Sequence, residues 1–224
     1  MYKACIALFL FFYAGSAAAQ TQPVIIHEAM CGSAAGVPAA AVTEEKDGDD
    51  FFSEAEKEER GGDLNTALTL FGKAAFEYNN DRNYARYGSS LLRLSNVHYQ
   101  LNHYTEAEQV ILNVALKTYS RMGSRAGQMA SYNQLGKIYL AAGKLTQSMW
   151  FYTQQGILAR QSGNNNAYID SILGLAMVKI QKKEYNLAAK DLNRAELLAK
   201  NAKTSQFRGQ IRQVRATIPL KKAI

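Results

Sequence analysis

Cysteine and proline are both scarce in this chain. Its 224 residues include two cysteines and three prolines. The prolines are Pro23, Pro38 and Pro219, so every residue from 39 to 218 has the amide donor that a helix needs. Two cysteines exclude a disulfide-rich small domain, and 47% hydrophobic residues exclude a chain that is disordered throughout. The long proline-free stretch favours an all-helical body.

Long apolar runs are also scarce, and the clearest one lies near the N-terminus. It runs from Ala4 to Ala14, after the positive charge of Lys3 and before three small residues, Ala17 to Ala19. Such a run is too short to span a hydrocarbon core, which needs roughly 20 residues, so an uncleaved anchor is the weaker interpretation. We expect residues 1–19 to be a signal peptide. The protein is then periplasmic or secreted, with no transmembrane segment in the mature chain.

Residues 20–47 are predicted to form a flexible linker, because they show no sustained apolar period. Cleavage after residue 19 removes Cys5 and leaves Cys31 alone, which excludes an intramolecular disulfide. We interpret Cys31 as a free thiol, with an intermolecular disulfide as the alternative. A cysteine-poor, exported, helical protein favours a bacterial envelope.

A repeat of about 40 residues follows the linker. Its small residues are separated by 40, 41 and 40 positions, at Ala67, Ala107, Ser148 and Ala188. Small residues let two antiparallel helices approach closely, and turns such as 142–144 contain a glycine that can adopt a positive φ. Because one helical hairpin cannot bury its own apolar face, several units must stack to build the core.

The clearest copy of the repeat contains Leu135, Gly136, Tyr139, Gly143, Leu145, Ser148 and Tyr152. It resembles the tetratricopeptide repeat (TPR), and its long period is similar to that of kinesin light chains and bacterial regulatory TPR proteins. The resemblance covers roughly 48–200. It implies an all-α, TPR-type α-solenoid of about four helical hairpins. The first unit departs from the pattern, since Glu56 to Glu59 replace expected apolar residues.

The last helix is expected within 203–218 and has two stripes. The apolar stripe is Phe207, Ile211, Val214 and Ile218. The cationic stripe is Arg208, Arg212 and Arg215. A terminal helix with one apolar face is expected to cap a solenoid. The repeat array with its capping helix is therefore predicted to occupy 48–218, and a short tail 219–224.

Constellations that carry catalysis or hold a metal are hard to find. His98 and His103 are five residues apart, which predicts different helical faces rather than a metal-binding i, i+4 pair. His27 and Cys31 have no second pair of ligands nearby. The glycines of 32–36 lack the Lys-Ser/Thr of a phosphate loop. We therefore expect no enzyme, no cofactor and no metal, and interpret His98 as a packing residue.

The TPR resemblance implies a partner-binding concave face, lined by the first helix of each unit. Mapping the units gives eight candidates, Arg93, Asn96, Gln100, Asn133, Lys137, Asp170, Met177 and Gln181. Cationic and amide side chains suit a peptide backbone or a carboxylate. A solvated helix surface is the alternative for each residue. The clamp by which TPR co-chaperones hold acidic C-terminal peptides is absent, because Leu92, Gln134 and Gly174 stand among its positions.

The net charge of +7 is unevenly divided. Residues 1–81 carry 5 basic and 13 acidic side chains, whereas residues 82–224 carry 21 and 6. A basic repeat body favours an acidic or polar partner, and we expect the acidic 44–59 segment to screen it.

The leading hypothesis is an exported, non-catalytic TPR module that binds a peptide segment or an envelope protein. One alternative is a sensory or regulatory module that works with a membrane sensor. The other is electrostatic binding to an anionic surface through the three arginines of the last helix. Export argues against nucleic acid as the partner. The oligomeric state is not predicted.

Overall fold

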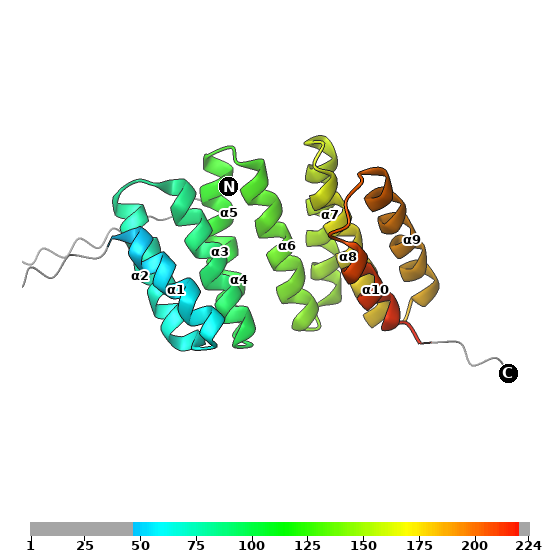
Figure 1. The fold of residues 1–224 in the computed structure, drawn as a ribbon, viewed down its shortest axis with the longest axis horizontal. Coiled ribbons are helices and arrows are strands. Elements are labelled where there is room, and N and C mark those ends of the chain that lie inside the picture. The colour runs from blue at the N-terminus through cyan, green and yellow to red at the C-terminus, as the bar shows by residue number, and fades with distance from the viewer. Residues whose placement is uncertain (1–46, 220–224) are drawn as a thin grey trace, which may run out of the picture. The chain divides into compact units, whose positions relative to one another are not determined.

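A computed structural model describes residues 47–219 of the chain. These residues form helices and no strands: α1 (Gly48–Gly61), α2 (Leu64–Asn80), α3 (Tyr84–Gln100), α4 (Tyr104–Gln109), the π-helical segment η1 (Val110–Ala115), α5 (Leu116–Arg121), α6 (Arg125–Ala141), α7 (Leu145–Gln161), α8 (Asn165–Gln181), α9 (Tyr185–Asn201) and α10 (Arg208–Ala216). Successive helices pack against each other along the chain (Figure 1). The predicted all-α solenoid of stacked hairpins is confirmed.

The chain divides into two units, 1–43 and 44–224, and the described residues all belong to the second. The predicted signal peptide, nearly all of the predicted linker, and residues 220–224 of the predicted tail lie outside the described residues. Within 47–219, no helix is both long enough and apolar enough to span a membrane.

Pairs of small residues, 12 positions apart, lie at the contact between the two helices of each hairpin. The pairs are Ala55 with Ala67, Ser95 with Ala107, Gly136 with Ser148, and Ala176 with Ala188, and all eight residues are buried. The Ser95 hydroxyl donates to the Ala107 carbonyl at 2.9 Å, and the Ser148 hydroxyl donates to the Gly136 carbonyl at 2.7 Å. Only small side chains allow the two backbones to approach within reach of one hydroxyl group.

One residue with a positive φ lies in each connection between these helices. The eight residues are Gly62, Arg82, Asn102, Gly123, Gly143, Gly163, Lys183 and Lys203. The left-handed conformation ends one helix and reverses the chain, and glycine adopts it without steric cost, as predicted for Gly143 (φ 72°). Uniform connections between helices of nearly uniform length produce the repeat of about 40 residues.

The one irregular spacing in the repeat has a structural cause. Helices α2, α3, α6, α7, α8 and α9 each contain 17 residues. The segments α4, η1 and α5 contain six residues each and run on as one helix of 18. A π-helical turn accommodates one additional residue without rotating the helix that follows. The spacing of 41 between Ala107 and Ser148 is therefore absorbed at η1.

The last helix covers the end of the stack. Phe207 and Ile211 are buried against residues of α8 and α9, and Val214 and Ile218 pack beside them. The predicted apolar stripe is thus confirmed. On its other side, Arg215 pairs with Glu196 of α9 at 2.8 Å.

Deletion of Asn113 from η1 tests this explanation of the spacing. Because Asn113 is exposed and lies in the π-helical turn, its loss should convert the segment to a regular 17-residue helix. We expect the free energy of unfolding to change by less than about 1 kcal/mol, since a regular turn replaces the bulge.

Deletion of the exposed Thr153 from α7 is the matched control. Without a bulge to absorb the change, the core residues that follow rotate out of place, which should cost roughly 3 kcal/mol or more. Urea denaturation followed by circular dichroism measures both variants. Equal destabilisation by the two deletions would contradict the explanation.

Candidate functional site

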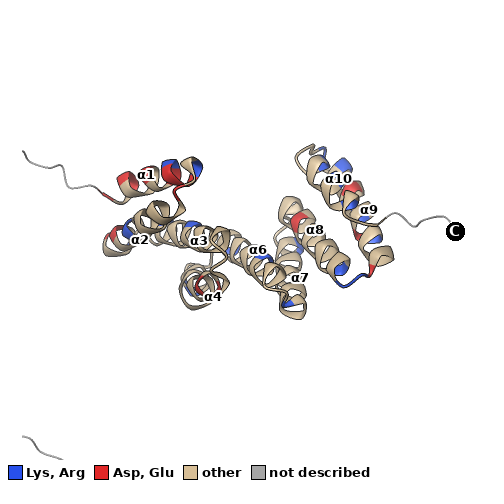
Figure 2. Ribbon diagram, turned by 90° about the horizontal axis from the view of Figure 1, so that it is seen from below, with Lys and Arg blue, Asp and Glu red and all other residues tan. Residues whose placement is uncertain are grey.

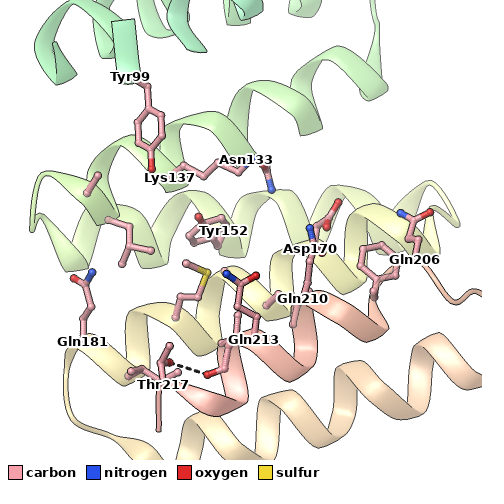
Figure 3. Close-up of a pocket in the computed structure, with 18 residues that line it drawn as sticks. Tyr99, Asn133, Lys137, Tyr152, Asp170, Gln181, Gln206, Gln210, Gln213 and Thr217 are labelled. Atoms are coloured by element: carbon pink, nitrogen blue, oxygen red, sulfur yellow. Dashed lines mark hydrogen bonds between the residues drawn. The ribbon is translucent and has the colours of Figure 1, made fainter. Parts of the chain in front are cut away.

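The first helices of successive hairpins, together with α10, form one face of the stack. Helix α3 contacts α6, α6 contacts α8, and α8 contacts α10. We call this face the inner face. A cavity of about 1040 Å³ lies on it, over α8 and between α6 and α10 (Figure 3). We call this cavity the groove.

The floor of the groove is apolar and depends on two glycines. The ring of Tyr152, from α7, is buried against both Gly136 of α6 and Gly174 of α8. A Cβ atom at Gly174 would lie 2.3 Å from the Tyr152 ring, and one at Gly136 would lie 2.6 Å from it. Glycine at both positions therefore lets the ring lie across the two helices. Leu173 and Phe207, both buried, extend the same floor.

The walls of the groove are polar and rich in amide groups. Tyr99, Asn133 and Lys137 lie on one side, from α3 and α6 (Figure 3). The opposite wall is α10 with the residues that flank it, and its polar side chains are Gln206, Gln210, Gln213 and Thr217. Gln210 and Gln213 are three residues apart on α10, which places them on one helical face, and Gln206 lies in the turn before this helix. The groove therefore combines an apolar floor with hydrogen-bonding walls.

Five of the eight predicted concave-face residues line this groove. They are Asn133, Lys137, Asp170, Met177 and Gln181. They come from α6 and α8, so the structure brings together the candidates of the third and fourth repeats.

The other three candidates, Arg93, Asn96 and Gln100, bind a carboxylate of the same chain. Glu59 of α1 accepts hydrogen bonds from the Asn96 amide at 3.0 Å and the Gln100 amide at 2.7 Å. Its second oxygen lies 2.8 Å from the Arg93 guanidinium, which also pairs with Glu56 at 3.3 Å. The glutamates that depart from the repeat pattern are thus bound by α3. Figure 2 shows the acidic residues of α1 beside this end of the stack.

A second hollow, of about 490 Å³, lies between α6 and the first turns of α8. Asn133 and Asp170 line both this hollow and the groove. The buried Gln155 is fully engaged here, because its amide accepts from Asn133 at 3.2 Å and donates to the Ala167 carbonyl at 3.2 Å. Gln134 is only 7% exposed, and its amide nitrogen has no hydrogen-bond partner.

Sequence reasoning did not propose five glutamines of this site as binding residues, namely Gln134, Gln155, Gln206, Gln210 and Gln213. Gln155 lies at a repeat position where other units have alanine, at Ala74 and Ala195, and that departure is a signal in the sequence. Gln134 occupies the same repeat position as Arg93 and Gly174, where no apolar residue is expected. The α10 glutamines lie outside the repeat, so no repeat position marks them.

Asp170 is the acidic residue that lines the groove. Burial raises the pKa of its carboxyl group, and the positive charge of Lys137 partly opposes that rise. A carboxylate that is partly desolvated beside a cavity costs stability, and such groups are common at binding sites.

His98 lies in α3 and His103 lies in the turn before α4, so the two do not form an i, i+4 pair on one helix. Their ring centroids are 6.0 Å apart, because the chain reverses at Asn102 and brings the start of α4 back beside α3. Within residues 47–219, no group of three or more metal-ligating side chains is assembled.

Replacement of Asp170 by Asn tests whether the carboxylate destabilises the fold. Because the pKa of Asp170 is raised in the folded protein, wild-type stability rises as pH falls through that pKa. We expect Asp170→Asn to raise the thermal midpoint at pH 7 and to lose that advantage in acid. Thermal melts of both proteins between pH 3 and 8 measure the difference, and an advantage that is absent at pH 7 would contradict it.

The comparisons with known proteins support the fold alone. The chain is similar to the solved structure titled "Crystal structure of BtubC (BKLC) from P. vanneervenii", with a TM-score of 0.62 and 16% sequence identity. The similarity covers 73% of this chain and 69% of that one. No protein-family model matches the chain, and no curated protein matches it. At this identity, the comparison supports an all-helical, repeat-like fold.

Proposed function

We propose that this protein is an exported, non-catalytic TPR interaction module that binds a peptide segment, free or part of an envelope protein, in the groove over α8. The observation that carries the proposal is the lining of the groove, which combines an apolar floor with amide-bearing walls on two sides. Apolar floors hold side chains, and amide side chains both donate to and accept from a peptide backbone.

The dimensions of the groove suit an extended peptide. Along α8, the groove reaches from Asp170 to Gln181. Eleven steps of 1.5 Å along a helix span about 16 Å, which matches roughly five residues of extended chain at 3.3 Å each. On α10, Gln210 and Gln213 are separated by a rise of roughly 4.5 Å.

The charges of the inner face differ from one end to the other. The cations and amides of α3 already hold Glu59, so this end of the face offers few free groups to an acidic partner. In the groove, Lys137 suits the acidic or polar partner that the sequence favours, whereas Asp170 suits a hydrogen-bond donor of that partner. The partner best suited to both is a polar peptide that carries its acidic groups near Lys137.

Assignment to the TPR family and export belong to the same proposal. The pairs of small residues, the repeat of about 40 residues and the hairpin stack support the first. The charged, apolar and small-residue pattern of 1–19 supports the second.

A second candidate function is binding to an anionic surface. A smaller hollow of about 390 Å³ between α9 and α10 is lined by Lys200, Lys203 and Arg208. Arg215, by contrast, is paired with Glu196. Cosedimentation with anionic vesicles at low and high salt distinguishes the two functions, because electrostatic binding weakens with salt.

Replacement of Met177 by Arg tests the proposed groove. Met177 lines the groove and is 40% exposed, so a longer charged side chain there should obstruct a peptide without disturbing the core. The probe is an octapeptide selected from a random phage-displayed library on the full-length chain. We expect its affinity, measured by fluorescence anisotropy, to fall by about tenfold or more, or 1.4 kcal/mol.

Leu197→Arg is the matched control, because Leu197 is 59% exposed and lies on α9, outside the groove. Its affinity should stay within about twofold of the wild type, since a change remote from the contact leaves binding free energy nearly unchanged. Equal weakening by both substitutions, or an affinity that Met177→Arg leaves intact, would contradict a peptide site in the groove.

A further inference from the structure

The hollow beside Gln134 carries an inference that rests on the proposed function and deepens it. We propose that this hollow is a second subsite of the peptide groove, in which Gln134 and Asp170 bind the main-chain amide groups of an extended peptide. The peptide then runs along the whole of α8, and the residue that faces Asp170 is not acidic.

The two hollows adjoin each other on the inner face, since they share two lining residues. Asn133 of α6 and Asp170 of α8 each line both of them. From this shared boundary, the groove extends towards Gln181, and the second hollow extends towards Asn164, just before α8. A chain that leaves the groove between Asn133 and Asp170 therefore enters the second hollow directly.

Gln134 lines this hollow, and its amide nitrogen is a buried hydrogen-bond donor without an acceptor. A buried polar group without a partner is destabilising, and native proteins retain few of them. Gln155, in the same hollow, uses both ends of its amide group within the chain. Gln134 instead leaves its amide nitrogen unpaired while being 93% buried. A rotation of the side chain would turn this donor into the hollow that Gln134 lines, where a carbonyl oxygen of a bound peptide would supply the missing acceptor.

The acceptor near Gln134, which is Asp170, determines which chemical class of ligand fits the second hollow. Asp170 lies at the boundary of the hollow and offers carboxylate oxygens. A ligand must therefore present an acceptor to Gln134 and a donor to Asp170, which is the pattern of successive C=O and N–H groups in a peptide main chain. A carboxylate at this place would lie against Asp170, and like charges brought together in an interface are strongly unfavourable.

The length of the combined site sets the length of the ligand. From Asn164 to Gln181, the two hollows follow α8 for 17 steps, or about 25 Å. An extended peptide covers that distance with roughly seven or eight residues at 3.3 Å each, against five for the groove alone. The second subsite therefore predicts that affinity continues to rise as a peptide is lengthened from five to eight residues.

The test compares an octapeptide, selected from a random phage-displayed library on the full-length chain, with pentapeptides truncated from either end. We expect the octapeptide to bind the wild type about tenfold more tightly than either pentapeptide, since two added hydrogen bonds contribute roughly that much. Gln134→Glu, which replaces the donor with an acceptor, should weaken the octapeptide by about tenfold or more. It should barely affect the pentapeptide that occupies the groove alone. Gln161→Glu, at an exposed position of α7, is the matched control and should have little effect.

A second measurement uses the wild-type protein, so it does not require any variant to fold. In a ¹H–¹⁵N spectrum of the wild type, the side-chain amide of Gln134 should shift downfield on addition of the octapeptide and stay in place with the groove pentapeptide. Equal affinities for octapeptide and pentapeptide, with an unshifted Gln134 amide, would overturn the second subsite. If Met177→Arg still abolished binding in that case, the proposed function would survive. A library that yields no peptide sensitive to Met177→Arg would overturn both.

Discussion

The close approach of two helices at paired small residues is the constraint on which the rest of this structure depends. Four pairs, each 12 positions apart, are buried where the helices of a hairpin meet. Because this contact recurs about every 40 residues, the first helices of the hairpins lie side by side and create the inner face. Gly136 and Gly174 have no side chain, so the Tyr152 ring can lie against both helices and form the floor of the groove.

Similar polar residues have different surroundings at the two ends of the inner face. At the first end, Arg93, Asn96 and Gln100 are engaged by Glu59, so an acidic group of the chain itself fills the place of a ligand. At the other end, α10 provides a second wall, and a cavity remains between it and α6. Both arrangements come from helices that flank the central repeats, which is why the ends of the stack determine where a partner can bind.

The repeat itself was predictable from sequence, because its spacing is imposed by geometry that every unit shares. The buried apolar stripe of α10 was predictable for the same reason, since helical periodicity shows it. Contacts between units were not predictable in this way. The pairing of Glu59 with residues 34 to 41 positions later depends on how far α1 lies over α3, and the α10 glutamines become a wall only once the stack positions that helix. The nearness of His98 to His103 depends on the turn at Asn102.

The central claim is that a partner lies on the inner face, along α8. Backbone ¹H–¹⁵N chemical shifts, recorded while a selected peptide is titrated into the full-length chain, test it most directly. The account predicts that the largest shifts fall on α6, α8 and α10, among the residues that line the groove. Shifts centred instead on the exposed apolar residues Trp150, Ile157 and Leu197 of α7 and α9 would contradict it.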